Sequence, residues 1–136
     1  MDIRTYIKKQ PLLFDGAMGT YYAACNHPGT GSCEQANLSE PDAIKQIHQA
    51  YLAAGCGAIK TNTFGVNRPA FGDGWEALLD AGYQLAVEAA DNQAFVFADI
   101  GPIDSPTPQK LYTEYQLVVD RFLSLGAENF LFETHS

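Results

Sequence analysis

Four polar side chains that could bind a ligand or take part in catalysis each close a short apolar segment of the sequence. They are Asp15, Asn62, Asp99 and Glu133. If the segments are parallel strands, their carboxyl ends meet at one rim, which is where catalytic groups gather in (β/α)₈ barrels. Structural interpretations remain open beside this one. Asp15 could cap a turn, Glu133 could be a surface acid, and Asp99 could anchor the turn that follows it.

Three residues of one loop have side chains that bind metals: Cys25, His27 and Cys33. Their irregular spacing and small number favour a solvent-exposed loop over a metal site. With Cys56 the cysteines are odd in number, and none has Cys-x-x-Cys spacing, as is typical of reduced thiols in a cytosolic protein. We expect no disulfide framework. His135, near the end of the sequence, is expected to pack or to be solvated.

The four apolar segments have the length of strands. Three of them are apolar without alternation, which suits a parallel sheet covered on both faces. The segments are Leu12–Asp15, Ala58–Asn62, Phe95–Asp99 and Phe130–Glu133.

A helix is predicted after the first strand. Ser39 stands as its N-cap, with Pro41 in the first turn and Asp42 completing a capping box. Gly55 stands where a left-handed residue ends a helix. His48 is expected on a partly exposed face of this helix.

Two more helices are predicted between the later strands. One runs from about Trp75 to Ala90, with Trp75 expected to pack rather than to stack on a ligand. The other starts with a capping box, Thr113-x-x-Gln116, and ends at Gly126.

The resulting order, βαβαβαβ, requires a parallel sheet of the α/β class. A dinucleotide-binding domain would carry G-x-G-x-x-G after its first strand, whereas Gly16 and Gly19 stand in a different register. A full barrel needs about 250 residues and eight strands. We therefore expect residues 1–136 to form a single truncated domain, the N-terminal half of a (β/α)₈ TIM barrel.

Composition narrows the classes of partner. The formal charge of −8 disfavours nucleic acid and anionic membrane surfaces. No apolar run approaches the ~18 residues of a membrane span, and the first residues lack the apolar core of a secretory signal. We expect a cytoplasmic protein that binds neither nucleic acid nor membrane.

Five motifs in order resemble the signature of the homocysteine S-methyltransferase family. They cover the chain from about Leu12 onward, and the resemblance is closest to the bacterial branch of methionine synthases and of bifunctional methyltransferase and methylenetetrahydrofolate reductase proteins. The motifs are Leu13–Thr20, Asn37–Pro41, Thr61–Gly65, Asp99–Pro102 and Phe132–Thr134.

The resemblance implies a site for homocysteine, in a protein that methylates this amino acid to methionine as part of one-carbon metabolism. Asp15 and Glu133 would bind the ammonium, backbone N–H groups of the glycine-rich stretch would bind the carboxylate, and Asn62 and Thr63 would complete the lining. The implied substrate-binding residues are Asp15, Gly16, Ala17, Met18, Gly19, Thr20, Asn62, Thr63 and Glu133.

The family also implies a zinc ion that binds the homocysteine sulfur as a thiolate, held by three cysteines. None of Cys25, Cys33 and Cys56 matches them, so these ligands are expected after Ser136, and the 136 residues alone are expected to be inactive. The implied methyl donor is methyltetrahydrofolate or methylcobalamin, with S-methylmethionine and betaine still open.

Two other interpretations are open. One is a non-catalytic half-barrel that pairs with a second copy, because its open sheet edges promote association. The other is an open-sheet nucleotide-binding domain. For the methyltransferase that the resemblance implies, the partners would be homocysteine and the missing C-terminal half of the barrel.

Overall fold

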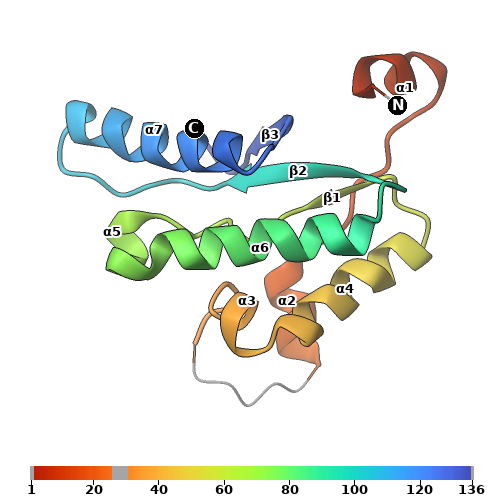
Figure 1. Ribbon diagram of the computed structural model, residues 1–136, viewed down its shortest axis with the longest axis horizontal. Helices are drawn as coiled ribbons and strands as arrows, with labels where there is room; N and C mark the ends of the chain where they lie inside the picture. Colours follow the sequence, from red (N-terminus) through yellow and green to blue (C-terminus); the bar gives the residue numbers. More distant parts are fainter. Residues whose placement is uncertain (1, 26–30, 136) are drawn as a thin grey trace.

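Three parallel strands form the frame of the protein, which we describe from a computed structural model in which residues 2–25 and 31–135 are placed. The strands are β1 (Ala58–Lys60), β2 (Phe95–Ile100) and β3 (Asn129–Phe132), in this order across the sheet. Helix α6 (Trp75–Ala90) connects β1 to β2, and helix α7 (Pro108–Ser124) connects β2 to β3 (Figure 1). The α/β class and the parallel order are confirmed.

The first predicted strand is only partly formed. Residues 12–15 run beside β1 but make a single parallel bridge, between Phe14 and Ala58. The Asp15 N–H donates to the Ala58 carbonyl at 3.0 Å. The prediction of four strands is therefore corrected to three strands and one bridged segment, because so few hydrogen bonds do not make a ladder.

Helix α4 (Pro41–Ala53) does not begin with the predicted capping box. Ser39 instead ends the short helix α3 (Ala36–Ser39), where its hydroxyl donates to the Gln35 carbonyl at 3.3 Å. The N-cap of α4 is Glu40, which makes no side-chain cap bond to the helix backbone. The prediction failed because two helices meet here, and Pro41 alone fixes the start of the second.

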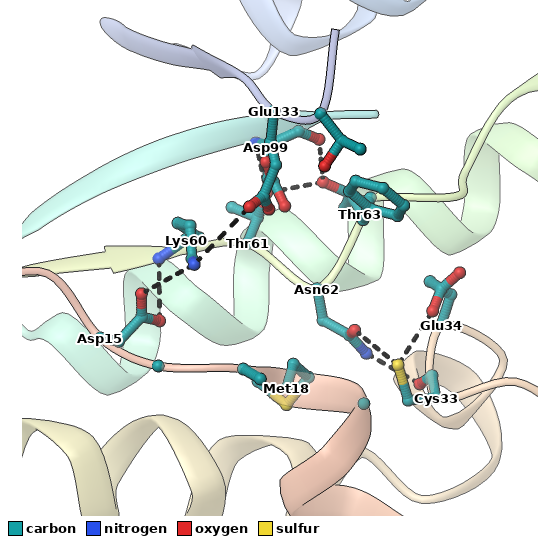
Figure 2. Close-up of a pocket in the computed structure, with 15 residues that line it drawn as sticks. Asp15, Met18, Cys33, Glu34, Lys60, Thr61, Asn62, Thr63, Asp99 and Glu133 are labelled. Carbon is teal, nitrogen blue, oxygen red and sulfur yellow. Dashed lines mark hydrogen bonds and ion pairs between the residues drawn. The ribbon is translucent and has the colours of Figure 1, made fainter. Parts of the chain in front are cut away.

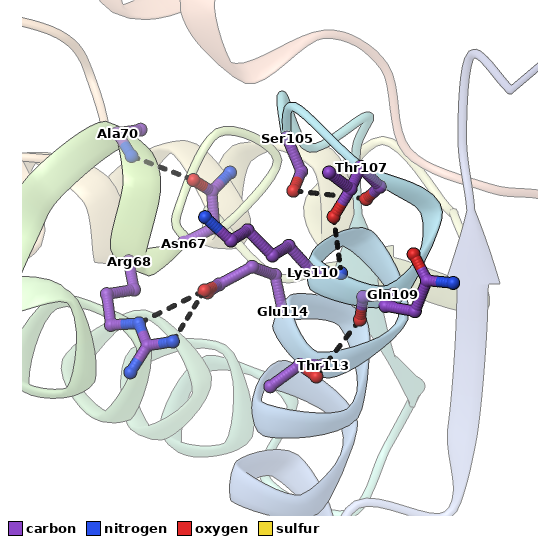
Figure 3. A network of polar contacts seen from close by, with 9 residues as sticks. All are labelled: Asn67, Arg68, Ala70, Ser105, Thr107, Gln109, Lys110, Thr113 and Glu114. Carbon is purple, nitrogen blue, oxygen red and sulfur yellow. Dashed lines mark hydrogen bonds and ion pairs between the residues drawn. The ribbon is translucent and has the colours of Figure 1, made fainter.

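Helix α7 also begins before its predicted capping box. Its N-cap is Thr107, whose Oγ1 accepts from the Lys110 N–H at 3.2 Å, and Pro108 takes the first helical position (Figure 3). Thr113 lies inside the helix and donates to the Gln109 carbonyl at 3.1 Å. Thr113 and Gln116 are therefore not a capping box, because a Thr-Pro start lies one and a half turns earlier.

The glycines predicted to end helices do so. Gly55 and Gly126 have φ values of 105° and 93°, in the region that residues with a Cβ rarely adopt. They follow α4 and α7, whose last helical residues are Ala53 and Ser124.

The remaining helices are short and were not predicted. They are α1 (Ile3–Lys9), α2 (Met18–Ala24), α5 (Arg68–Phe71) and a 3₁₀ turn, η1 (Gly72–Gly74). The Arg68 guanidinium joins α5 to α7 through the buried Glu114 carboxylate, with Nη2 and Oε1 2.6 Å apart (Figure 3). In the described part of the chain, no helix is long and apolar enough to cross a membrane.

Helix α6 holds the core together because it lies between α4 and α7 (Figure 1). Its largest contact cluster joins Leu79 with Ala98 of β2 and Phe122 of α7, all fully buried. Trp75 is 5% exposed and belongs to this cluster, so its predicted packing role is confirmed. Burial of this kind contributes about 25 cal/mol per Å² of apolar area, and it fixes the strands whose ends form the site.

His48 differs from its prediction. The side chain is fully buried in α4, and neither ring nitrogen has a hydrogen-bond partner among the described residues. The sequence places it one residue after Ile47, beside the apolar face of the helix, but α6, α3, α2 and β1 all pack against α4, so more than one apolar stripe of this helix is covered. Burial lowers the pKa of His48 from 6.5 to about 4.

Acid should therefore destabilise the fold through His48. The unfolded chain binds a proton near pH 6.5 and the folded chain only near pH 4, so stability is lost as pH falls through this window. Between pH 7 and pH 5, we expect the wild type to lose about 2 kcal/mol more unfolding free energy than His48→Leu. Urea unfolding at both pH values measures the difference, and parallel losses in the two proteins would contradict it.

Exposed apolar side chains lie at both edges of the sheet, beside β3 and beside β1. Among the described residues, β3 pairs only with β2, and Phe132 and Leu13 are 52% and 62% exposed. Unpaired edges with apolar side chains promote association. We expect the 136-residue chain to associate in sedimentation velocity, and Phe132→Lys to shift it toward the monomer. A wild type that stays monomeric over a wide concentration range would refute this prediction.

Candidate substrate-binding site

A cavity of about 440 Å³ lies at the carboxyl ends of the strands (Figure 2). Its walls come from the segment after the first bridge, the loop before α3, the turn after β1, and the ends of β2 and β3. The lining residues are Asp15, Gly16, Ala17, Met18, Gly19, Cys33, Glu34, Lys60, Thr61, Asn62, Thr63, Phe64, Asp99, Glu133 and Thr134.

The structure brings together most of the residues selected from the sequence. Of the implied substrate-binding set, Thr20 alone is outside the lining; it is an exposed residue of α2. Asp99, for which a turn anchor was an equal alternative, also lines the cavity. Proximity in one cavity does not assign a role to each residue, so their contacts decide what each can do.

The two carboxylate oxygens of Asp15, which lines the cavity, differ in their hydrogen bonds. Its Oδ2 accepts from the Lys60 backbone N–H at 3.1 Å, whereas the buried Oδ1 has no hydrogen-bond donor among the described residues. Burial raises the pKa of Asp15 to about 6, although the backbone N–H and the ammonium of Lys60 both lower it. Asp15 therefore has an acceptor available for a cationic or donor group of a ligand.

Asp99 and Glu133 form the acidic wall opposite. Asp99 is 4% exposed, and its Oδ1 also has no hydrogen-bond donor among the described residues. Burial first, and the neighbouring Glu133 carboxyl second, raise the pKa of Asp99 above its usual range. Two acids this close favour one shared proton, because two adjacent negative charges repel each other in a half-buried site.

A short chain of hydrogen bonds holds the residues that follow β3 in place. The Glu133 N–H donates to the Ile100 carbonyl at 3.0 Å, and His135 Nε2 lies 3.2 Å from the same carbonyl. A carbonyl only accepts, so Nε2 carries the proton, and Nδ1 can accept from the Tyr115 hydroxyl at 3.4 Å. His135 thus fixes the segment that carries Glu133, which agrees with the expected packing role.

Two threonines hold the end of β2 in a closed ring. The Asp99 N–H donates to Thr61 Oγ1 at 3.0 Å, and Thr63 Oγ1 donates to the Asp99 carbonyl at 2.7 Å. The two hydroxyls are 2.7 Å apart, so the Thr61 hydroxyl donates to Thr63. The hydroxyl proton of Thr63 is thus used inside the protein, and what it can offer a ligand is an acceptor.

Asn62 is the centre of a second buried network. Its Nδ2 donates at 2.8 Å both to the Cys33 carbonyl and to Asn37 Oδ1, while Asn37 Nδ2 donates to the Asn62 carbonyl at 2.8 Å. Gly82 of α6 allows this packing, because a Cβ there would lie 2.6 Å from Asn37 Nδ2. Both amide protons of Asn62 serve to position the loop before α3.

The Cys33 thiol forms part of the cavity wall, a position that the sequence did not indicate. Its Sγ lies 2.9 Å from Glu34 Oε1 and 3.3 Å from Asn62 Oδ1. Burial and the Glu34 carboxylate raise the pKa of this thiol to about 12, so it stays protonated at neutral pH. Cys33 is therefore a hydrogen-bonding thiol here, while His27 of the same loop lies outside the described residues.

Lys60 and Glu34 are the charged lining residues that sequence reasoning missed. Lys60 is the last residue of β1, and its Nζ lies 3.8 Å from Asp15 Oδ1 and 4.0 Å from Glu133 Oε2. Its one available signal was a charge inside the apolar segment 58–62. Among the described lining residues, Lys60 is the single cation beside four carboxyl groups.

The sequence model of the family described as homocysteine S-methyltransferase matches residues 12–136. The chain belongs to this family. Methionine synthase of Mycobacterium tuberculosis (strain ATCC 25618 / H37Rv) is 30% identical over 157 residues, an alignment that covers 98% of this chain and 13% of that protein. This is the family that the ordered motifs indicated.

Solved structures show the same fold. The metallated form of the homocysteine methyltransferase MmuM from Escherichia coli has a TM-score of 0.83 at 21% identity, covering 97% of this chain and 57% of that one. Its apo form has a TM-score of 0.73 at 21% identity, covering 94% and 51%. The α/β fold described above thus corresponds to part of the TIM barrel of homocysteine methyltransferases. The chain spans little more than half the length of these enzymes.

The Asn62 network predicts a large cost for its loss. Asn62→Ala leaves the Cys33 carbonyl and Asn37 Oδ1 without donors, and each buried unsatisfied group costs about 1–3 kcal/mol. We expect a fall of about 2–5 kcal/mol in unfolding free energy, measured by urea titration. Gln84→Ala, on the exposed face of α6, is the control and should change stability little. A stable Asn62→Ala protein would show that the network is dispensable.

Proposed function

We propose that this chain forms the amino-acid-binding part of a homocysteine S-methyltransferase active site. The observation that carries the proposal is the Asp15 carboxylate, which lines the same cavity as Glu133 and whose Oδ1 has no hydrogen-bond donor among the described residues. Family membership supplies the substrate: the family is defined by homocysteine, whose ammonium is the kind of group that such an acceptor binds. The whole protein would transfer a methyl group to the homocysteine sulfur and release methionine.

The ammonium would lie between Asp15 and Glu133. These carboxylates approach the cavity from opposite edges of the sheet, and Lys60 Nζ lies between them, 3.8 Å from Asp15 Oδ1 and 4.0 Å from Glu133 Oε2, so the ligand ammonium would bind beside Lys60. An ammonium has three donors and can bond to both acids at once. A bound cation also favours the charged form of Asp15, whose pKa is raised mainly by burial.

The carboxylate end would lie along residues 16–19. These four residues line the cavity, and Gly16 is held closely: a Cβ there would lie 2.8 Å from Tyr51 Oη. The Tyr51 hydroxyl donates to the Ala17 carbonyl at 2.7 Å, which fixes the start of α2. The small side chains of Gly16, Ala17 and Gly19 leave the backbone open to a ligand. Asn62 and Thr63 would complete the polar wall as acceptors.

The residues described here do not fit a metal site. Within residues 2–25 and 31–135, no group of three or more His, Cys, Asp or Glu side chains could hold a metal ion. The Cys33 thiol in the cavity stays protonated, whereas a zinc ligand is a thiolate. We therefore assign no chemical step to a metal held by these residues, and zinc-binding cysteines elsewhere in the protein remain a prediction of the family resemblance.

The two acids provide the test. Asp15→Asn and Glu133→Gln each replace a charged acceptor by a neutral amide of the same shape, so each should lower the affinity for L-homocysteine about 10- to 100-fold. Isothermal titration calorimetry measures the dissociation constants directly and needs no turnover. Circular dichroism spectra should show that both variants keep the fold.

Glu88→Gln is the matched control. Glu88 is an exposed acid of α6 that pairs with Lys45 at 3.3 Å, away from the cavity, so this change should leave homocysteine affinity within about two-fold. Equal affinity in the wild type, Asp15→Asn and Glu133→Gln would remove the assigned roles of both acids.

A further inference from the structure

The ammonium of Lys60 is a charged group of the cavity that the binding scheme above leaves without a role. It projects from the end of β1 between Asp15 and Glu133, and its side chain is 20% exposed (Figure 2). The two N···O distances, 3.8 and 4.0 Å, exceed the hydrogen-bond range. Its three N–H donors thus make no hydrogen bond with the described residues.

The backbone N–H of Lys60, unlike its ammonium, does make a hydrogen bond to Asp15. The Lys60 N–H donates to Asp15 Oδ2 at 3.1 Å, whereas Asp15 Oδ1 has no hydrogen-bond donor in the described part of the chain. The cavity therefore holds a cation and an anion that form an ion pair at 3.8 Å, while the Lys60 ammonium and Asp15 Oδ1 make no hydrogen bond with the described residues. Partly buried charged groups are unfavourable without hydrogen bonds, so a ligand that supplies both partners gains from both.

We propose that Lys60 determines the specificity of the site by binding the α-carboxylate of the amino acid while Asp15 and Glu133 bind its ammonium. The proposal rests on the proposed function and adds a selection for zwitterions. An α-amino acid carries its two opposite charges on neighbouring groups, as Lys60 and Asp15 do. An amine without a carboxylate would bring a second cation next to Lys60 and leave its donors unsatisfied. The backbone of residues 16–19 can take the second carboxylate oxygen.

The test compares two ligands that differ only in the carboxylate. L-Homocysteine and 3-aminopropane-1-thiol, its decarboxylated form, are titrated calorimetrically into the wild type and into Lys60→Met, which keeps an unbranched side chain one atom shorter and removes the charge. We expect the wild type to prefer homocysteine at least about 10-fold, as a charge-assisted hydrogen bond implies. In Lys60→Met the preference should fall to within about two-fold.

Lys45→Met is the control, because Lys45 lies on α4 and pairs with the exposed Glu88. It should keep the wild-type ratio. Lys60→Gln repeats the measurement with a polar side chain if the methionine variant does not fold. A general loss of structure would weaken both ligands together, whereas loss of a carboxylate contact changes their ratio.

The outcomes separate the two proposals. If homocysteine binds to the wild type in an Asp15-dependent way and Lys60→Met and Lys60→Gln keep the full preference, the role of Lys60 is overturned and the proposed function stands. If the wild type does not bind homocysteine, both are overturned.

Discussion

The hydrogen bond from the Lys60 backbone N–H to Asp15 Oδ2 is the contact on which the site depends. The segment that carries Asp15 is joined to β1 by one bridge and a few backbone bonds, so its position is not secured by a ladder. A carboxylate that accepts a strand N–H extends that pairing by one residue. It also leaves the other oxygen for the ion pair with the Lys60 ammonium. The segment with the fewest backbone hydrogen bonds to the sheet is therefore held in place by Asp15, the same residue that would bind the ligand.

The rest of the rim is built in the same way, from polar side chains that close on the backbone. The ring of Thr61, Thr63 and Asp99 uses both hydroxyls and both backbone groups of Asp99. The Asn62 network uses both amide protons. Buried polar groups of this kind are costly unless all are satisfied, and satisfied networks hold one geometry. The carboxylates of Asp15 and Asp99 are the exceptions, since each has one oxygen without a hydrogen-bond donor within residues 2–25 and 31–135.

The sequence predicted the fold class, three of the strands and most of the lining, because strand ends of a parallel sheet are readable from apolar runs that stop at a polar residue. It did not predict Lys60, whose charge interrupts such a run, or Cys33, which enters the cavity from a loop through contacts with Asn62. His48 failed for a related reason: its burial depends on the elements that pack around α4. The two capping boxes failed because prolines at 41 and 108 define helix starts more strongly than the motifs do.

The protonation of the acids in the cavity could not be predicted from each residue alone, because their charges act on one another. Burial raises the pKa of Asp15 and of Asp99, and Lys60 opposes this for both. Glu133 acts in the reverse direction on both acids. The protonation of each acid is thus set by residues from four separate segments, which only the fold brings together. A cation entering this cavity adds to the effect of Lys60 and shifts the acids toward their charged forms, so ligand binding and proton release are coupled by the same geometry.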